Sequence, residues 1–123
     1  MPIRFYRIPT RPPSLPTCSG HAPATGDDAL PSREQIERTA ELFRALGDPE
    51  RLRLLVKLGQ AERCVSELVG DDDNFSTVSA RLHHLLRARL VLRRRESKHM
   101  YYRLADEHVV RMVRDALDHA DEP

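Results

Sequence analysis

The sequence predicts a mainly α-helical domain of the α+β class, with one β-hairpin near its C-terminal end. Two observations predict this fold class. Apolar residues recur at the three- and four-residue spacing of a buried helix face in several segments between residues 32 and 89. The spacing then changes to short strand-like segments in LVLRRR and HMYYRL, and becomes helical again in the last segment. With 123 residues, 40% of them hydrophobic, the chain is long enough for one small domain.

The first 31 residues are expected to form a flexible Pro-rich arm. They contain seven of the nine prolines together with Ser, Thr and Gly, a composition typical of irregular segments. The folded domain is therefore expected to span residues 32–122. No run of 18 apolar residues is present, and the N-terminus lacks the apolar stretch of a secretory signal. We therefore expect a cytoplasmic protein with no membrane association.

Four helices are predicted before the hairpin. SREQIERTAELFRAL forms the first, because it is apolar at helical spacing and is followed by Gly47. Asp48 is a good N-cap and Pro49 suits the first helical position, so a second helix follows directly and should end before Gly59. CVSELVG predicts a short third helix, and FSTVSARLHHLLRAR predicts a fourth after the polar loop DDDN. The apolar positions of the first and fourth helices are Ile36, Leu42, Phe43, Leu46, Val78, Leu82, Leu85 and Leu86.

A β-hairpin follows the fourth helix. LVLRRR and HMYYRL are predicted strands, joined by Glu96, Ser97 and Lys98. Helices, a fourth helix with a polar face and then a basic hairpin make the order of a winged helix-turn-helix domain. One further helix at the C-terminus is expected to serve dimerisation.

The charge distribution indicates a nucleic-acid partner. The formal net charge is only +1, yet residues 76–103 contain eight Lys or Arg and one acid, Glu96. Residues 104–122 contain six acids against two arginines, so the basic part of the chain is separate from the terminal helix. A helix fits the major groove of duplex DNA and hairpin arginines can meet phosphates, so we expect double-stranded DNA as the partner.

The terminal segment DEHVVRMVRDALDHADEP has the pattern of a shared metal site. His108 and His119 lie on nearly the same side of a helix but about 16 Å apart along its axis, too far for one ion to bridge. If two copies packed antiparallel about a twofold axis, His108 of one chain would come level with His119 of the other. Asp106 and Glu122 would add one carboxylate from each chain. Two imidazoles and two carboxylates suit zinc or cobalt.

An ordinary structural explanation of this helix stays open. Asp106 is a good N-cap, and surface histidines are common. Met112 and Ala116 lie between the histidines and fit a dimer seam, or they could face the chain's own core. The positions that fit burial against the chain's own core better are Val109, Val113, Leu117 and Ala120.

Residues 32–122 resemble the ArsR/SmtB family of metal-responsive winged-helix repressors. The resemblance rests on ELFRALGDPERLRLLVKL, CVSELV, STVSARLHHLLRARLV and RRRESKHMYYRL, and most specifically on D-x-H and H-x-x-E in the last helix. In zinc and cobalt sensors of the family, that last pattern forms the site between the two terminal helices. The resemblance therefore implies Asp106, His108, His119 and Glu122 as ligands.

The resemblance also implies a second site that involves the two cysteines. In some relatives the N-terminal arm of one protomer meets the third helix of the other, and Cys18 with His21 and Cys64 with Glu67 match the residues used there. Many relatives have a second cysteine where this chain has Ser66, which argues against a thiophilic ion such as cadmium. Alternatively, Cys64 is a small buried residue and Cys18 only a tail residue.

Candidate DNA contacts follow from the fold. Relatives commonly have a histidine where this chain has Ala80, so base preference could differ here, as could the relay of the metal signal. His83 and His84 are expected at the surface or near the DNA backbone. The expected groove contacts at the start of the fourth helix are Ser76, Thr77, Ser79 and Arg81, and the expected wing contacts are Arg94, Arg95, Lys98 and His99.

The resemblance implies a homodimeric repressor that binds operator DNA without metal and releases it when zinc binds. Sensing of another metal (cobalt, nickel or cadmium), or of oxidants through Cys18 and Cys64, stays open. An enzyme is not expected, because four protein ligands leave no position for a water, and no phosphate loop or nucleophile motif is visible. No small-molecule substrate is expected either.

Overall fold

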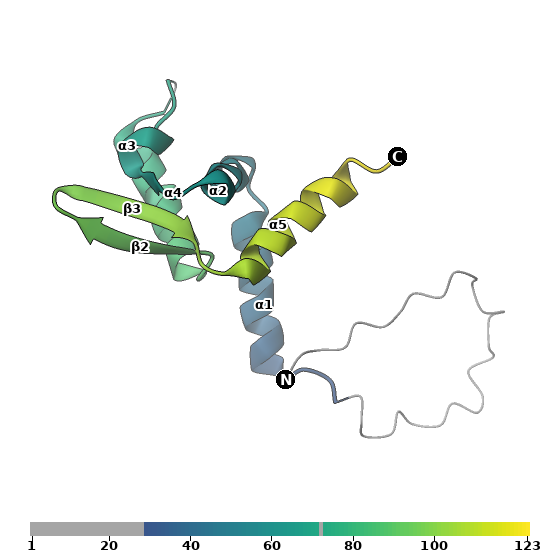
Figure 1. Ribbon diagram of the computed structural model, residues 1–123. Coiled ribbons are helices and arrows are strands. Elements are labelled where there is room, and N and C mark those ends of the chain that lie inside the picture. The colour runs from purple at the N-terminus through teal and green to yellow at the C-terminus, as the bar shows by residue number, and fades with distance from the viewer. Residues whose placement is uncertain (1–28, 72) are drawn as a thin grey trace, which may run out of the picture. The chain divides into compact units, whose positions relative to one another are not determined.

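The computed structural model describes residues 29–71 and 73–123, and Ser32–Pro123 form one compact unit (Figure 1). The predicted flexible arm, residues 1–31, lies outside the described residues except for its last three. The elements in chain order are α1 (Arg33–Leu46), α2 (Pro49–Gln60), β1 (Arg63–Cys64), α3 (Val65–Leu68), α4 (Phe75–Arg87), β2 (Val91–Glu96), β3 (His99–Leu104) and α5 (Glu107–Ala120). This is a winged helix-turn-helix domain with an added terminal helix, which confirms the predicted fold class.

The junction between α1 and α2 is held by hydrogen bonds to the backbone. The side chain of Asp48 accepts from Arg51 N at 2.9 Å, as expected of an N-cap, and Pro49 occupies the first turn of α2. The guanidinium of Arg51 donates back to the carbonyls of Ala45 (2.8 Å) and Arg44 (3.0 Å) at the end of α1. The Arg44 carbonyl also accepts from Gly47 N at 3.2 Å, so Arg51 gives it a second donor, and it satisfies the Ala45 carbonyl at the end of the helix. One arginine therefore fixes the turn between the two helices.

The prediction that α2 ends before Gly59 was wrong, because the helix continues to Gln60. A glycine lowers helix propensity by about 1 kcal/mol but does not forbid helical backbone. Leu54, Leu55 and Leu58 are buried and hold the last turns of α2 on the core.

The sheet has three strands rather than the predicted two. Arg63 and Cys64 form β1, which pairs antiparallel with β3, and the strand order is β1-β3-β2. The expected helix CVSELVG is therefore shorter than predicted and begins at Val65. A two-residue strand carries no periodic pattern, and its partner lies far along the chain, so local sequence could not reveal it.

The predicted hairpin is present, with a turn of two residues. Its register pairs Val91 with Leu104 at the base and Glu96 with His99 at the tip, so Glu96 belongs to β2 rather than to the loop. Ser97 has φ 57°, in the left-handed region that two-residue hairpin turns often require.

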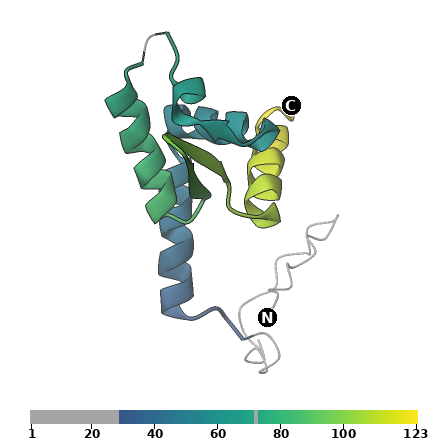
Figure 2. The ribbon, with the colours of Figure 1, turned by 60° about the vertical axis from the view of Figure 1, so that its left-hand side comes forward.

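The core lies between the helices and the inner face of the sheet (Figure 2). Leu55, Leu82, Leu85 and Leu90 are fully buried, and Tyr102 contributes from β3. No helix of the described part of the chain is long and apolar enough to cross a membrane.

Several residues with apolar side chains lie outside this core. The N-terminal half of α1 extends past the rest of the unit in both ribbon views, and Ile36 and Phe43 are 55% and 60% exposed (Figures 1 and 2). On α5, Val109 and Val113 are buried as predicted, whereas Leu117 is 43% exposed and Ala120 is exposed. The predicted burial of Leu117 and Ala120 against the chain's own core was therefore wrong, because Leu117 lies only at the edge of a shallow hollow between α2 and α5.

Candidate nucleic-acid interface and metal ligands

The exposed face of α4 is set by the residues that the helix buries. Val78, Leu82 and Leu85 point into the core, so the positions between them face outward. Ser76 is exposed, whereas Thr77 and Ser79 are half-buried. The exposed positions that share this face are Ser76, Ala80, His83 and Arg87. The exposure of His83 agrees with its expected place at the surface or near the DNA backbone, whereas Ala80 and Arg87 were not among the expected groove contacts, although the spacing of the buried residues contains the signal.

Two of the predicted groove contacts have partners within the chain. Asn74 caps α4 and accepts hydrogen bonds from Thr77 N (2.8 Å) and Thr77 Oγ1 (2.9 Å). Arg81 donates to Asp73 Oδ1 at 3.2 Å and is partly buried. These contacts fix the start of α4 relative to the loop before it. A role of Thr77 or Arg81 in DNA binding stays a prediction.

The four predicted wing contacts fall into two groups. Arg95 and Lys98 are exposed, and neither forms an ion pair with any residue in 29–71 or 73–123. Arg94 is instead paired with carboxylates, and His99 Nδ1 lies 3.7 Å from Cys64 Sγ. The tip of the hairpin therefore presents its free charge through Arg95 and Lys98.

The terminal helix carries one histidine–carboxylate pair at each end. Asp106 caps α5 by accepting from Val109 N at 3.1 Å, and its Oδ1 also lies 3.6 Å from His108 Nδ1. At the other end, His119 Nδ1 lies 3.5 Å from Glu122 Oε2. All four side chains are exposed. Within residues 29–71 and 73–123, no three His, Cys, Asp or Glu side chains gather closely enough to hold a metal. Each end of the helix therefore presents one imidazole and one carboxylate.

Cys64 and Glu67 are engaged in local contacts. The buried Cys64 Sγ lies 3.2 Å from Ser66 Oγ and close to His99. Glu67 Oε1 accepts from Cys64 N at 3.1 Å and so caps the start of α3. Their expected partners, Cys18 and His21, lie outside the described residues.

A helix-turn-helix with an exposed basic hairpin defines a DNA-binding transcriptional regulator rather than an enzyme. No family model matches the chain. A transcriptional repressor described as an SmtB homolog, from Synechocystis sp., is 42% identical over 92 residues, which cover 74% of this chain and 70% of the relative.

Solved structures agree with this class. A homodimeric winged helix-turn-helix DNA-binding domain from Mycobacterium bovis, a possible ArsR-family regulator, has a TM-score of 0.70 at 35% identity, over 76% of this chain and 91% of that one. The antimony-specific transcriptional repressor AntR has a TM-score of 0.66 at 28% identity, over 85% and 96%. The chain belongs to the ArsR/SmtB family of winged-helix transcriptional repressors, which are DNA-binding regulators and not enzymes.

Proposed function

We propose that this chain is a zinc-responsive repressor, whose metal-free homodimer binds operator DNA and releases it when zinc binds between the two terminal helices. The observation that carries the proposal is the pair of exposed histidine–carboxylate groups at opposite ends of α5. Each group offers one imidazole and one carboxylate, which is half of a four-ligand site.

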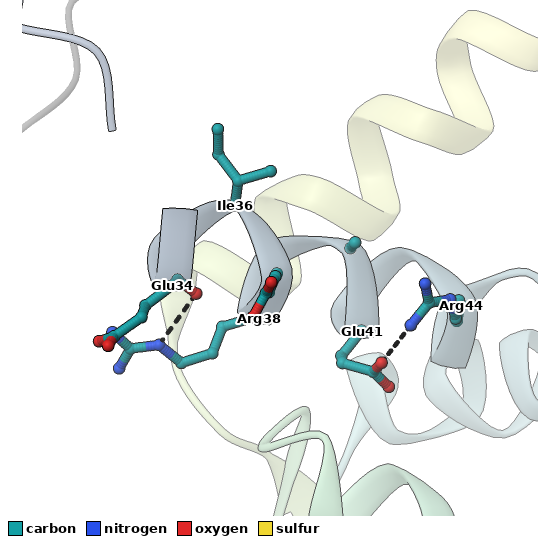
Figure 3. A pocket seen from close by; sticks show the side chains of 7 residues that line it. Glu34, Ile36, Arg38, Glu41 and Arg44 are labelled. Carbon is teal, nitrogen blue, oxygen red and sulfur yellow. Dashed lines mark hydrogen bonds and ion pairs between the residues drawn. The ribbon is translucent and has the colours of Figure 1, made fainter. Parts of the chain in front are cut away.

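Dimerisation is supported by the apolar residues that the single chain leaves uncovered. In Figure 3, Ile36 projects from one side of α1, and the charged side chains of Glu34, Arg38 and Glu41 project from the other side of the same helix. Phe43 is also exposed, as is Leu117 on α5. If a second copy of the chain covered these side chains, the apolar surface removed from water would stabilise the dimer by roughly 25 cal/mol per Å².

The donor set fits the proposed ion. Asp106 and His108 of one protomer with His119 and Glu122 of its partner would supply two nitrogens and two carboxylate oxygens, a combination that zinc accepts in tetrahedral geometry. Bound zinc would supply a cross-link between the two terminal helices. Cobalt accepts the same ligands, so the ligand type favours zinc over softer ions, and the choice between zinc and cobalt rests on the supply of each metal in the cell.

The response to metal follows from linkage. Zinc weakens DNA binding only if it binds more tightly to a dimer conformation that fits DNA poorly, and DNA must then weaken zinc binding by the same factor. Cross-linking the terminal helices would favour one angle between protomers and so change the spacing of the two α4 helices.

A second metal position at Cys64 has less support. Glu67 already accepts a hydrogen bond from Cys64 N, and recruiting its carboxylate would remove the cap of α3. The ions named for cysteine-rich relatives, such as cadmium, are also less suited to a chain with Ser66 in place of a second thiolate.

The test is a titration by fluorescence anisotropy. A labelled duplex from upstream of the protein's own gene is titrated with metal-free protein at one fixed salt concentration, and zinc is then added. We expect tight binding that is reversed by stoichiometric zinc. The double variant His108→Gln/His119→Gln should bind DNA as the parent does and should not be released by zinc. Asp115→Asn, an exposed acid elsewhere on α5, is the matched control and should behave as the parent.

Three outcomes would contradict the proposal. Release of the double variant by zinc would exclude the terminal-helix site. Tight binding that no zinc concentration reverses would exclude a zinc response, and repeating the titration with cobalt, nickel or cadmium would then identify another metal. Release by oxidant, with a disulfide between Cys18 and Cys64 found by mass spectrometry, would favour the cysteine-based alternative.

A further inference from the structure

Arg94 on β2 has more intramolecular contacts than any other arginine of the wing. Its Nε donates to Glu62 Oε1 and Oε2 at 2.9 and 3.1 Å, and Nη2 donates to Glu62 Oε1 at 2.6 Å. The remaining amino group, Nη1, donates to Glu96 Oε2 at 2.7 Å. The guanidinium carbon also lies 4.6 Å from the centre of the Tyr101 ring. The guanidinium is therefore held on both edges and on one face.

These contacts span the whole sheet. The register places Arg94 opposite Tyr101, and Tyr101 opposite Cys64 in β1, so the three residues lie on one face of the sheet, opposite to the face of the buried Tyr102. Glu62 directly precedes β1 and lies 32 residues before Arg94 in the sequence. Arg94 therefore reaches from the outer strand of the hairpin, across β3, to the segment that joins α2 to the sheet.

The existing ion pairs of Arg94 disfavour a DNA phosphate as its partner. Its guanidinium donates to the carboxylates of Glu62 and Glu96, and Arg103 also lies near enough to Glu62 to lower the pKa of that carboxyl. The hydrogen bonds from Arg94 lower the pKa of the Glu62 carboxyl, and the same bonds raise the pKa of Arg94, so this ion pair stays charged at neutral pH. A phosphate would have to displace Glu62 and would be repelled by Glu96.

Arg95 and Lys98 differ from Arg94 in this respect. Arg95 pairs across the hairpin with Met100, on the opposite face of the sheet from Arg94, and Lys98 is in the turn. Both are exposed, and no carboxylate of the described residues is within ion-pair distance of either. Their charge is available to an external anion.

We propose that Arg94 is a positioning residue of the wing: with Glu62 and Glu96 it clamps the hairpin to the base of the sheet, so that Arg95 and Lys98 meet the DNA backbone while Arg94 contacts no phosphate. This revises the expectation from sequence that Arg94 is a wing contact. The inference rests on binding of DNA by the metal-free dimer, as in the proposed function, and needs no zinc response.

The salt dependence of DNA binding tests the clamp. Each phosphate neutralised contributes about 0.9 to the slope of log K against log salt, and the number of contacts can therefore be counted. The metal-free protein is titrated into the same labelled duplex at several salt concentrations. Arg95→Gln and Lys98→Gln should each reduce the slope by about 0.9 per protomer. Arg94→Gln and Glu62→Gln should weaken binding several-fold at every salt concentration and leave the slope unchanged.

The exchanged variant Glu62→Arg/Arg94→Glu, made together with Glu96→Gln, separates positioning from direct contact. Glu96→Gln removes the carboxylate that would otherwise repel a glutamate at position 94. The exchange restores the ion pair with reversed polarity, so under the proposal it should recover much of the affinity lost in Arg94→Gln/Glu96→Gln. An Arg94 that contacted phosphate could not be replaced by a glutamate, and the exchanged variant would then bind more weakly than Arg94→Gln/Glu96→Gln. Thermal unfolding of each variant verifies that the domain is folded.

Three results would overturn the clamp. The first is a slope reduced by Arg94→Gln as much as by Arg95→Gln. The second is tighter binding with a steeper slope for Glu62→Gln, which would mean that Glu62 withholds Arg94 from DNA. The third is a slope unchanged in both Arg95→Gln and Lys98→Gln, which would mean that the wing contacts no phosphate. Each is measured without metal, so failure of the zinc response affects none of them.

Discussion

The two candidate metal-binding regions of the chain differ in how far their donor atoms are already in use. His108 and His119 are 92% and 85% exposed, and the Nδ1 of each lies 3.6 or 3.5 Å from a carboxylate oxygen, farther than in an ordinary hydrogen bond. Cys64 is 7% exposed, and Glu67 is bonded to its backbone. A site for a reversible ligand needs donors that can be recruited at little structural cost, and the ends of α5 meet that condition better.

The largest effect expected from this difference is on zinc affinity. His119→Gln removes a ligand, and its zinc dissociation constant should rise by more than ~100-fold, because loss of a mere outer-shell partner already costs ten- to a hundred-fold. Cys64→Ser should change the constant by less than about twofold, a margin within ordinary mutational variation. Competition with a chromophoric zinc chelator measures both. A larger loss in Cys64→Ser than in His119→Gln would reverse the comparison.

Mixing the single variants His108→Gln and His119→Gln tests whether each metal site takes its ligands from both protomers. A heterodimer of His108→Gln with His119→Gln has one site with both substitutions and one site with both native histidines. After random exchange of subunits, roughly a quarter of the parental sites should therefore bind zinc again. The readout is high-affinity zinc bound per dimer, before and after exchange. Recovery of no sites would show that the ligands are not shared between protomers.

Asp106 has two roles in the proposal that substitution can separate. Serine can cap α5 as Asp106 does, but it has no carboxylate. The free energy of unfolding of Asp106→Ser should therefore lie within a few tenths of a kcal/mol of the parent value. Asp106→Ala should lose about 1 kcal/mol. Both variants should need at least ~10-fold more zinc for release of DNA. If Asp106→Ser responds to zinc as the parent does, the carboxylate serves only as a cap.

The smallest expected effect concerns Glu67. Glu67→Gln keeps an acceptor for Cys64 N and should be nearly neutral, whereas Glu67→Ala should lose about 0.5 to 1.5 kcal/mol in denaturant unfolding, the net worth of one hydrogen bond. Zinc-induced release should be unchanged in both. A loss of release in Glu67→Gln, with stability intact, would mean that the region at Cys64 is the regulatory one.

Local patterns in the sequence were enough to predict the long helices and the hairpin. Asp48 with Pro49, and Asp106 before the last helix, mark helix starts through bonds that span only a few residues. The features that could not be predicted depend on contacts between distant parts of the chain. β1 exists only because β3 pairs with it, and the partner of Arg94 is Glu62, 32 residues away.

Among the candidate functional residues, too, local contacts could be predicted from the sequence and contacts that depend on the fold could not. The pairing of His119 with Glu122 was predictable, since side chains three residues apart are neighbours on a helix. Asp106 lies near His108 because it caps the helix just before the first turn. The outward face of α4 could have been derived from the buried Val78, Leu82 and Leu85, but the preference for polar residues as contacts obscured Ala80. That Arg81 would be tied to Asp73 depends on the conformation of a loop, which has no periodic pattern.

The exposed Ile36 and Phe43 on α1 make protein concentration a variable of the response. Because a second copy of the chain would cover them, assembly follows mass action, and the apparent stability of the folded protein rises with its own abundance. Newly made chains at low copy number would be mostly monomers, each with one α4 helix and, under the proposed function, only half of the ligands of each metal site. The cell would therefore set its threshold for repression by the synthesis rate of this protein as well as by its supply of metal.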